Sequence, residues 1–267
     1  MFTVRILSYG SALGFRTRYD VRMNTHDSTN RTAIVTGASS GIGEATARLL
    51  SQGGYNVVLA ARRADRLEAL AAELGENALA VPTDVTDPAA CEALVARTVE
   101  RFGALDVLVN NAGIGLYGAI AEADPDDWRK MFDVNVLGVL YTTRAAIRHM
   151  LPRGSGDVVF ISSVASRRVP NAYGAVYSAT KHALSAITEG LRMDMEGKGI
   201  RVVSVEPGLV RTEFPMNSYS SAEEYYAQKD YAPLEAEDVA EAVLYAVNQP
   251  LSVVVNEILL RPTDQLN

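Results

Sequence analysis

Residues 32–43 read TAIVTGASSGIG, and this stretch decides which fold the sequence predicts. Its first five residues form a short apolar strand, three glycines follow within a polar turn, and Glu44 to Leu50 starts a helix. Glycines let the backbone pass close to a ligand, and the free amides at the start of a helix attract an anion. The order of strand, turn and helix therefore favours a phosphate-binding turn, with a purely structural turn as the alternative.

The rest of the chain continues the alternation of strand and helix, with no further internal repeat and no dividing linker. We therefore predict one α/β domain over residues 31–267, a length that suits a single large core. Further apolar strands are expected at 56–61, 78–81, 106–110, 157–161, 200–205 and 253–260. Helices are expected at 64–74, 88–102, 128–151 and 238–248, with another opened by Pro125 and another ending near Met195.

Composition excludes several classes of protein. The net charge of −7 argues against a broad nucleic-acid-binding surface. No apolar run reaches the roughly eighteen residues that a membrane span needs. The single cysteine, Cys91, excludes an intrachain disulfide and fits a cytoplasmic protein. The three histidines show no ligand spacing, so we expect no metal site.

Residues 1–30 differ in character from the domain that follows. They are polar, carry four arginines and contain no acidic residue before Asp20. This composition resembles an organelle transit segment, although it lacks the apolar core of a secretory signal. We favour the simpler interpretation, a disordered extension upstream of a working start at Met23.

Two arginines follow the second expected strand. In the dinucleotide-binding fold, an acidic side chain near the end of this strand would bind the ribose 2′-hydroxyl. Ala61 stands at that place, and Arg62 and Arg63 come next. The planar fork of arginine suits a phosphate, so the pattern favours NADP over NAD. The alternative is that both arginines merely begin the solvated helix at 64–74.

Tyr177 and Lys181 are four residues apart, so they share one face of a helix. A nearby cation favours the phenolate and is expected to lower the pKa of the tyrosine. Bringing that pKa near 7 takes roughly 4 kcal/mol, which one lysine does not supply, so a second positive charge or a desolvated pocket is required. Taken alone, the pair fits a solvated helix face as well as a catalytic pair.

Other residues are expected near this pair. Ser163 follows the strand at 157–161, so its hydroxyl is placed to bind a substrate carbonyl. Tyr173 has no lysine four residues further on, which makes Tyr177 the better acid. Asn135 is either a satisfied core amide or the holder of a water or backbone carbonyl near the site. Residues 209–232 are rich in aromatic side chains and are expected to form a lid.

These motifs together resemble the short-chain dehydrogenase/reductase family, and the match covers about residues 31–262. The combination is highly specific: Thr36-Gly37-x-x-x-Gly41-x-Gly43, Asn110-Asn111-Ala112-Gly113, Ser163, Tyr177-x-x-x-Lys181 and Pro207-Gly208. The resemblance implies a single doubly wound Rossmann domain with a seven-stranded parallel sheet flanked by helices. It also implies a homodimer or homotetramer that acts on a small carbonyl or alcohol substrate with NADP(H).

The resemblance further implies a role for each matching residue. Tyr177 would be the acid in carbonyl reduction and the base in alcohol oxidation. Lys181 would bind the nicotinamide ribose and lower the pKa of Tyr177, with the oxidised nicotinamide as the second cation. Ser163 would orient the carbonyl oxygen, and Asn135 would hold a water in the proton relay.

The cofactor contacts implied by the resemblance are spread along the chain. The pyrophosphate and adenosine side would meet Gly37, Ser39, Gly41, Ile42 and Gly43. Asp84 and Val85 would lie at the adenine, and Asn111 and Gly113 at the ribose. Pro207, Gly208 and Thr212 would surround the carboxamide. Arg62, with Arg63 beside it, would grip the 2′-phosphate.

Two features narrow the subgroup. The sequence has Glu206-Pro207-Gly208 where many members have Asn-Pro-Gly, and the chain ends in a distinctive stretch at 256–265. Both features are similar to those of NADP-dependent 3-hydroxy acid dehydrogenases and clavulanate-type aldehyde reductases. The alternatives are a carrier-protein-linked 3-oxoacyl reductase, which the acidic balance supports little, and a non-catalytic NADP-binding sensor, which would not need the intact Asn135, Ser163, Tyr177 and Lys181.

Overall fold

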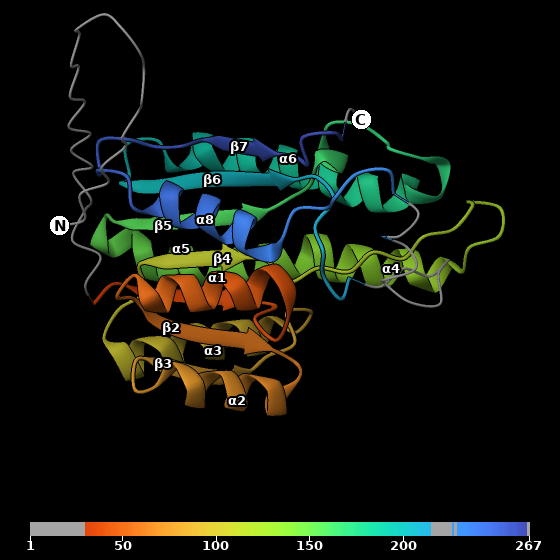
Figure 1. Ribbon diagram of the computed structural model, residues 1–267. Helices are drawn as coiled ribbons and strands as arrows, with labels where there is room; N and C mark the ends of the chain where they lie inside the picture. Colours follow the sequence, from red (N-terminus) through yellow and green to blue (C-terminus); the bar gives the residue numbers. More distant parts are fainter. Residues whose placement is uncertain (1–29, 215–225, 227–228, 266–267) are drawn as a thin grey trace, which may run out of the picture.

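The computed structural model describes residues 30–214, 226 and 229–265. Within these residues, seven strands form one sheet in the order β3-β2-β1-β4-β5-β6-β7, and all neighbouring strands are parallel (Figure 1). The predicted doubly wound α/β fold with a seven-stranded parallel sheet is confirmed. The extension expected at 1–30 lies outside the described residues except for Asn30.

The strands place one edge of the sheet in position to bind a ligand. They are β1 Thr32–Thr36, β2 Asn56–Ala61, β3 Ala78–Pro82, β4 Val107–Asn110, β5 Gly156–Ile161, β6 Ile200–Pro207 and β7 Glu257–Leu260. The strand order reverses between β1 and β4, so the chain leaves these two strands in opposite directions. In open parallel sheets this reversal creates a crevice at the carboxyl ends of the strands.

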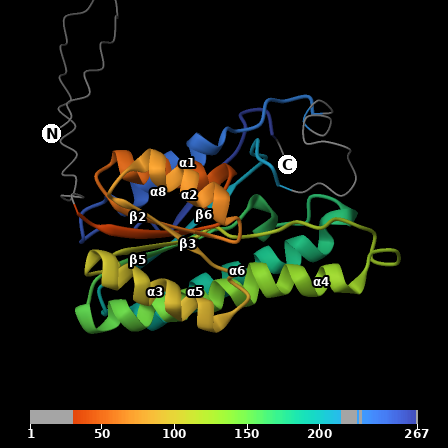
Figure 2. The same cartoon turned by 90° about the horizontal axis from the view of Figure 1, so that it is seen from below.

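Helices cover both faces of the sheet (Figure 2). One face carries α1 Gly41–Gln52, α2 Ala64–Leu74 and α8 Ala236–Val247. The other carries α3 Pro88–Phe102, α5 Val139–Met150 and α6 Ala175–Met195, with α4 Pro125–Phe132 leading into α5. Short 3₁₀ turns occupy Leu151–Arg153, Val164–Ser166 and Ala172–Gly174. None of the helices in the described part of the chain combines the length and apolar character that a membrane crossing requires.

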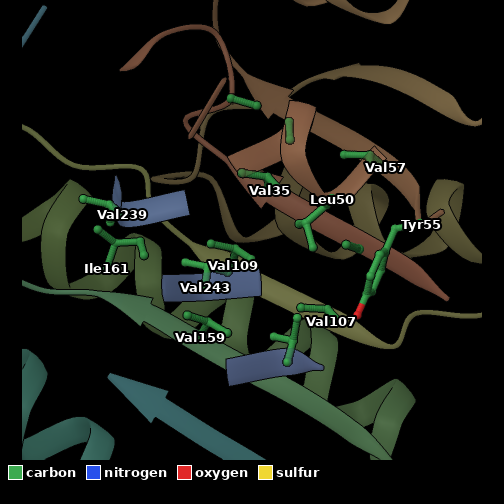
Figure 3. Packing of buried hydrophobic residues seen from close by; sticks show 14 of the residues in the cluster. Val35, Leu50, Tyr55, Val57, Val107, Val109, Val159, Ile161, Val239 and Val243 are labelled. Atoms are coloured by element: carbon green, nitrogen blue, oxygen red, sulfur yellow. The ribbon is translucent and has the colours of Figure 1, made fainter. Parts of the chain in front are cut away.

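Each face of the sheet has its own apolar core, because successive strand residues point to opposite faces. Val35 of β1 packs with Leu50 of α1 and Val243 of α8 in the first core (Figure 3). Its neighbour Ile34 packs in the second core, with Leu94 of α3. All five side chains are buried, and burying a Val, Leu or Ile side chain contributes about 1.5–3 kcal/mol.

The helix predicted over 128–151 is interrupted. α4 ends at Phe132, and a π-helical turn at Asp133–Gly138 precedes α5. Gly138 lies so close to the loop after β3 that an added Cβ would be 2.8 Å from Cγ2 of Val85. A π-helical turn inserts an extra residue into the helical repeat and is frequent at functional sites. Here that turn contains Asn135.

The last strand is shorter than predicted, since it begins at Glu257 and not at residue 253. Arginine side chains bind the preceding carbonyl groups. Arg201 donates to the carbonyl oxygen of Val253 at 3.0 Å, whereas that of Asn256 accepts both from Arg192 at 2.6 Å and from the Ser204 amide of β6 at 2.9 Å. A backbone carbonyl satisfied by a guanidinium group, as that of Val253 is, does not need a neighbouring strand.

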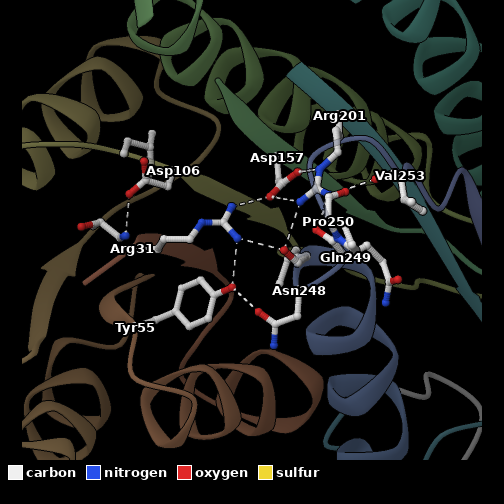
Figure 4. A network of polar contacts seen from close by, with 12 residues as sticks. Arg31, Tyr55, Asp106, Asp157, Arg201, Asn248, Gln249, Pro250 and Val253 are labelled. Carbon is white, nitrogen blue, oxygen red and sulfur yellow. Dashed lines mark hydrogen bonds and ion pairs between the residues drawn. The ribbon is translucent and has the colours of Figure 1, made fainter. Parts of the chain in front are cut away.

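A buried polar network joins the elements at the amino edge of the sheet (Figure 4). Asp157 of β5 accepts hydrogen bonds of 2.5 and 2.9 Å from Arg201 and also pairs with Arg31. Arg31 donates to the hydroxyl of Tyr55 at 3.1 Å, and that hydroxyl donates to Asn248 at 2.7 Å. The network therefore ties β1, β5 and β6 to the end of α8.

Candidate active site

A cleft of about 800 Å³ opens at the carboxyl edge of the sheet. It lies where the strand order reverses, as the fold predicts. All predicted site residues line this cleft except Gly43 and Asn135. The lining members are Gly37, Ser39, Gly41, Ile42, Arg62, Arg63, Asp84, Val85, Asn111, Gly113, Ser163, Tyr177, Lys181, Pro207, Gly208 and Thr212.

The glycine-rich turn between β1 and α1 forms the floor of one end of the cleft. Gly37 has a φ of +68°, a conformation that favours glycine. Gly43 lies behind the turn, where an added Cβ would be only 2.3 Å from the carbonyl oxygen of Gly37. At the start of α1, the N-cap Ser40 makes no side-chain capping bond. The first amides of this helix thus remain available for an anion.

Asn111 holds the turn in place. Its side-chain amide donates to the carbonyl oxygen of Thr36 at 2.8 Å, and its backbone amide donates to the Thr36 hydroxyl at 2.9 Å. These bonds link the end of β4 to the end of β1 across the crevice. The expected position of Asn111 beside a ribose stays a prediction, because its side-chain bonds are to the protein itself.

Arg63 contacts the turn more directly than Arg62 does. Its Nε donates to the Ser39 hydroxyl at 3.0 Å, and its Nη2 donates to the Ser40 hydroxyl at 2.6 Å. Arg62 lines the cleft beside Asp84, whose pKa is lowered mainly by the Thr86 amide and also by the Arg62 charge. The order of importance implied by the resemblance, Arg62 before Arg63, therefore needs an experimental test.

Ser163 and Tyr177 meet in the cleft although fourteen residues separate them. Ser163 precedes the 3₁₀ turn at Val164–Ser166, and its hydroxyl accepts a hydrogen bond of 3.1 Å from the Ala165 amide. This bond orients the hydroxyl, which lies close enough to the side chain of Tyr177 to lower the pKa of that tyrosine. By contrast, Tyr173 is 59% exposed, so it faces solvent.

The predicted lowering of the Tyr177 pKa is wrong for the protein chain by itself. Burial raises the pKa of Tyr177 to about 12, and the neighbouring Ser163 hydroxyl opposes this only in part. Burial also lowers the pKa of Lys181 to about 8. The Lys181 ammonium lies 5.8 Å from the centre of the tyrosine ring. A second positive charge is therefore still needed to favour the phenolate.

Asn135 is a satisfied buried amide that fixes the wall of the cleft. Its Oδ1 accepts a hydrogen bond of 2.8 Å from the amide of Ile114, and its Nδ2 donates to the carbonyl oxygen of Ile114 at 2.8 Å. Nδ2 also donates to the Thr180 hydroxyl at 3.1 Å. Both donors are used, so the role in holding a water stays a prediction and the observed role is to bind the backbone.

Two aromatic residues lie beside Tyr177, and sequence reasoning singled out neither, although Phe214 falls within the predicted lid at 209–232. The ring centres of Tyr117 and Phe214 lie 5.7 and 5.8 Å from that of Tyr177. Gly115 makes room for Phe214, since an added Cβ there would be 2.2 Å from the phenylalanine ring. The glycines preceding Tyr117 in Gly113-Ile114-Gly115 were a usable signal that a ring packs against this loop.

The segment predicted as a lid is described only in part. Residues 215–225 and 227–228 lie outside the described residues. Tyr226 is buried, and its hydroxyl donates to the carbonyl oxygen of Val210 at 2.7 Å while accepting from the Thr212 amide at 3.1 Å. Gln265, a further lining residue, accepts a hydrogen bond of 2.9 Å from the Leu209 amide.

Acidic, histidine and cysteine side chains form no cluster of three or more that could hold a metal ion in the described part of the chain.

The parallel sheet, the glycine turn at a helix start, and the Ser163, Tyr177 and Lys181 side chains together define a Rossmann-type oxidoreductase. The model of the short chain dehydrogenase family matches residues 31–223. The chain belongs to this family, as its motifs predict.

Relatives and solved structures agree with this assignment. An uncharacterised oxidoreductase of Staphylococcus aureus is 42% identical, over 88% of this chain and 98% of its own length. The closed form of a serine dehydrogenase complexed with NADP⁺ is 36% identical with a TM-score of 0.83, covering 88% of this chain and 96% of that one. A short chain dehydrogenase from Burkholderia cenocepacia in complex with NADP is 33% identical with a TM-score of 0.78, covering 88% and 98%.

Proposed function

We propose that the protein is an NADP(H)-dependent oxidoreductase that transfers a hydride between the nicotinamide and a carbonyl or secondary alcohol carbon of a small molecule. The observation that carries this proposal is the meeting of Ser163 and Tyr177 in the cleft, with Lys181 one helical turn beyond the tyrosine. Family membership and the NADP named in similar structures support the choice of cofactor.

The residues of the cleft fit the proposed cofactor. The glycine turn and the start of α1 suit the pyrophosphate, because no side chain caps the first amides of this helix. Arg62 and Arg63 follow β2, where a 2′-phosphate needs positive charge. Lys181 would reach the nicotinamide ribose from α6. When bound, the nicotinamide supplies or accepts the hydride; all other chemistry belongs to the protein.

Tyr177 would act as the acid in carbonyl reduction. Its pKa of about 12 keeps the hydroxyl protonated at neutral pH, which suits proton donation to the carbonyl oxygen. The Ser163 hydroxyl would hold that oxygen in place and stabilise the charge that develops on it. In alcohol oxidation the same tyrosine must act as a base, and the charges of Lys181 and of the oxidised nicotinamide would favour its phenolate form.

The proposed substrate is small, either an aldehyde or a 3-hydroxy acid. The rings of Tyr117 and Phe214 beside Tyr177 favour an apolar group next to the reacting carbon. A comparison of kcat/KM across aldehydes, ketones and 3-hydroxy acids, with NADPH or NADP⁺, separates the two classes. If none of these compounds reacts with NADPH or NADP⁺, the result would instead support a sensor. The homodimer or homotetramer expected from the family stays a prediction that light scattering can test.

The reaction is tested with Tyr177→Phe and a matched Tyr173→Phe variant. Removing the acid should lower kcat by about 10²–10⁴-fold while NADPH affinity stays nearly unchanged. Tyr173 lies one helical turn earlier and is exposed, so its variant should keep normal turnover. Near-normal turnover by Tyr177→Phe would exclude the proposed mechanism.

A further inference from the structure

One carboxylate occupies the arginine cluster beside the phosphate-binding turn. Glu213 accepts hydrogen bonds of 3.1 and 2.8 Å from Nη1 of Arg66, and one of 3.1 Å from Nη1 of Arg63. Both arginines belong to the start of α2, whereas Glu213 belongs to the segment after β6, about 150 residues further along the chain. The contact between Arg63 and Glu213 therefore joins two distant segments of the chain that both line the cleft.

Arg63 places this carboxylate close to the turn. The same guanidinium that binds Glu213 also donates to the hydroxyl groups of Ser39 and Ser40. All three of its nitrogens are thus engaged, two by the turn and one by the carboxylate. Since Arg63 follows β2, Glu213 lies where an anionic group on the adenosine ribose would need to bind.

The charges favour an exchange of anions at this place. Two arginines and one carboxylate leave the cluster with one net positive charge. A phosphate brings a charge of about −1.5 to −2 and three acceptor oxygens, so it binds paired guanidinium groups better than a carboxylate does. A carboxylate remaining beside that phosphate would repel it. Binding of a 2′-phosphate is therefore expected to displace Glu213.

We propose that Glu213 is a specificity-determining residue of the cofactor site, whose carboxylate competes with the 2′-phosphate for Arg63 and Arg66. The competition weakens binding of ligands that carry a 2′-phosphate and leaves ligands without it unaffected. An exposed ion pair is readily exchanged in this way, and the Glu213 side chain is 58% exposed. The inference rests on the proposed function, because it assumes that the arginines receive the phosphate of NADP(H).

The test uses two small ligands that differ only in the 2′-phosphate, adenosine 2′,5′-bisphosphate and adenosine 5′-monophosphate. Their affinities are measured by calorimetry for the full-length wild-type protein and for Glu213→Gln. The variant should bind the bisphosphate about three- to tenfold more tightly, and its affinity for the monophosphate should change by less than about twofold. A matched control is Glu73→Gln, which removes another exposed carboxylate paired with an arginine, Arg48, outside the cleft.

An unchanged or weakened affinity of Glu213→Gln for the bisphosphate would overturn the proposal, since Glu213 would then organise the arginines and not compete for them. Arg63→Ala separates this failure from failure of the cofactor site itself. If Arg63→Ala weakens the bisphosphate but not the monophosphate, the phosphate site stands whatever Glu213 does. Equal effects of Arg63→Ala on both ligands would defeat the assignment of Arg63 to the phosphate site as well.

Discussion

The ammonium of Lys181 donates a hydrogen bond of 3.0 Å to the carbonyl oxygen of Ile161. This bond joins α6 to the last residue of β5, two residues before Ser163. Lys181 is only 7% exposed, and burial lowers its pKa to about 8. The lysine therefore positions the tyrosine helix against the serine while carrying a charge that its surroundings disfavour.

This buried charge predicts how stability depends on pH. The Lys181 pKa is about 8 in the folded chain, below its ordinary value of 10.5. Between these two pH values Lys181 binds more protons in the unfolded chain, so its contribution to the free energy of unfolding rises with pH, by about 3 kcal/mol at most. Below pH 8 Lys181 is charged in both states, so the buried ammonium lowers the free energy of unfolding by its full amount. Lys181→Met should abolish this rise.

The measurement is denaturant unfolding of both proteins at steps from pH 7.5 to 10. Tyr177 does not interfere there, because its raised pKa reduces stability only as pH rises beyond about 10. Lys198→Met is the control, since Lys198 is an exposed lysine paired with Asp194 within one helical turn. Parallel pH profiles for wild type and Lys181→Met would contradict the prediction.

Asn135→Ala is predicted to reduce both stability and activity. It leaves the amide and carbonyl of Ile114 without their partner, which should cost about 1–3 kcal/mol in free energy of unfolding. Ile114 lines the cleft, so kcat should also fall, by about tenfold or more. Thermal unfolding and steady-state kinetics measure the two effects.

Asn110→Ala provides the matched control for this prediction. Asn110 is also a buried asparagine, and it bonds to the hydroxyls of Thr142 and Thr143 at 2.6 and 2.8 Å. Its loss should reduce stability by a similar amount but leave kcat nearly unchanged, since its threonine partners, unlike Ile114, do not line the cleft. Equal losses of kcat in both variants would show that Asn135 acts only through stability.

Most of the fold could be predicted because its central strands, β1, β2, β4, β5 and β6, are buried on both faces. Such strands read as unbroken apolar runs, and residues 32–36 and 56–61 were predicted with the bounds that the structure has. The π-helical turn could not be predicted, because it depends on the approach of Gly138 to Val85 and on the bonds of Asn135 to Ile114. These are contacts between distant segments.

The candidate site divides in the same way. The sequence pattern predicted that Tyr177, Lys181 and Ser163 lie near one another, and all three line the cleft. This could be predicted because the order of strands and helices determines which residues meet at the carboxyl edge. Glu213 and Phe214 fall within the predicted lid at 209–232, but sequence reasoning did not predict their contacts with Arg63 and Tyr177, since nothing in the local sequence marks them. The direction of the Tyr177 pKa shift was also missed, because burial is a property of the folded chain.

Arg167→Ala is predicted to destabilise the protein through a buried carboxylate. The Glu206 side chain is only 4% exposed and pairs with Arg167. Without the arginine, the Glu206 carboxylate still accepts the hydrogen bond of 3.1 Å from the Ser204 hydroxyl, but it has lost this positive charge. The free energy of unfolding should fall by about 2–4 kcal/mol, as denaturant titration can measure.

Two further variants test this explanation. Glu257→Gln removes the half-exposed carboxylate that also pairs with Arg167, and it should cost no more than about 1 kcal/mol. Adding Glu206→Gln to Arg167→Ala removes the unpaired charge and should restore part of the lost stability. No recovery in the double variant would mean that packing of the arginine, and not its charge, stabilises this corner.

Asp157→Asn should separate stability from catalysis most clearly. Its carboxylate is 2% exposed and binds both Arg31 and Arg201, so the neutral amide leaves two guanidinium groups without their shared counter-charge. The free energy of unfolding should fall by about 3–5 kcal/mol. The network lies at the amino edge of the sheet and the cleft at the carboxyl edge, so kcat of the folded fraction should stay unchanged.

Asp106→Asn is the comparison, because Asp106 also lies at the amino edge but is 17% exposed and pairs with the exposed Arg153. In Asp106→Asn the amide oxygen can still accept the hydrogen bond of 2.8 Å that the Thr32 amide gives to the carboxylate. The free energy of unfolding should therefore fall by only about 1 kcal/mol. Denaturant titrations of wild type, Asp157→Asn and Asp106→Asn give the free energy of unfolding, and steady-state kinetics at about 20 °C give kcat. A large loss of kcat in Asp157→Asn would show that the two edges of the sheet are energetically coupled.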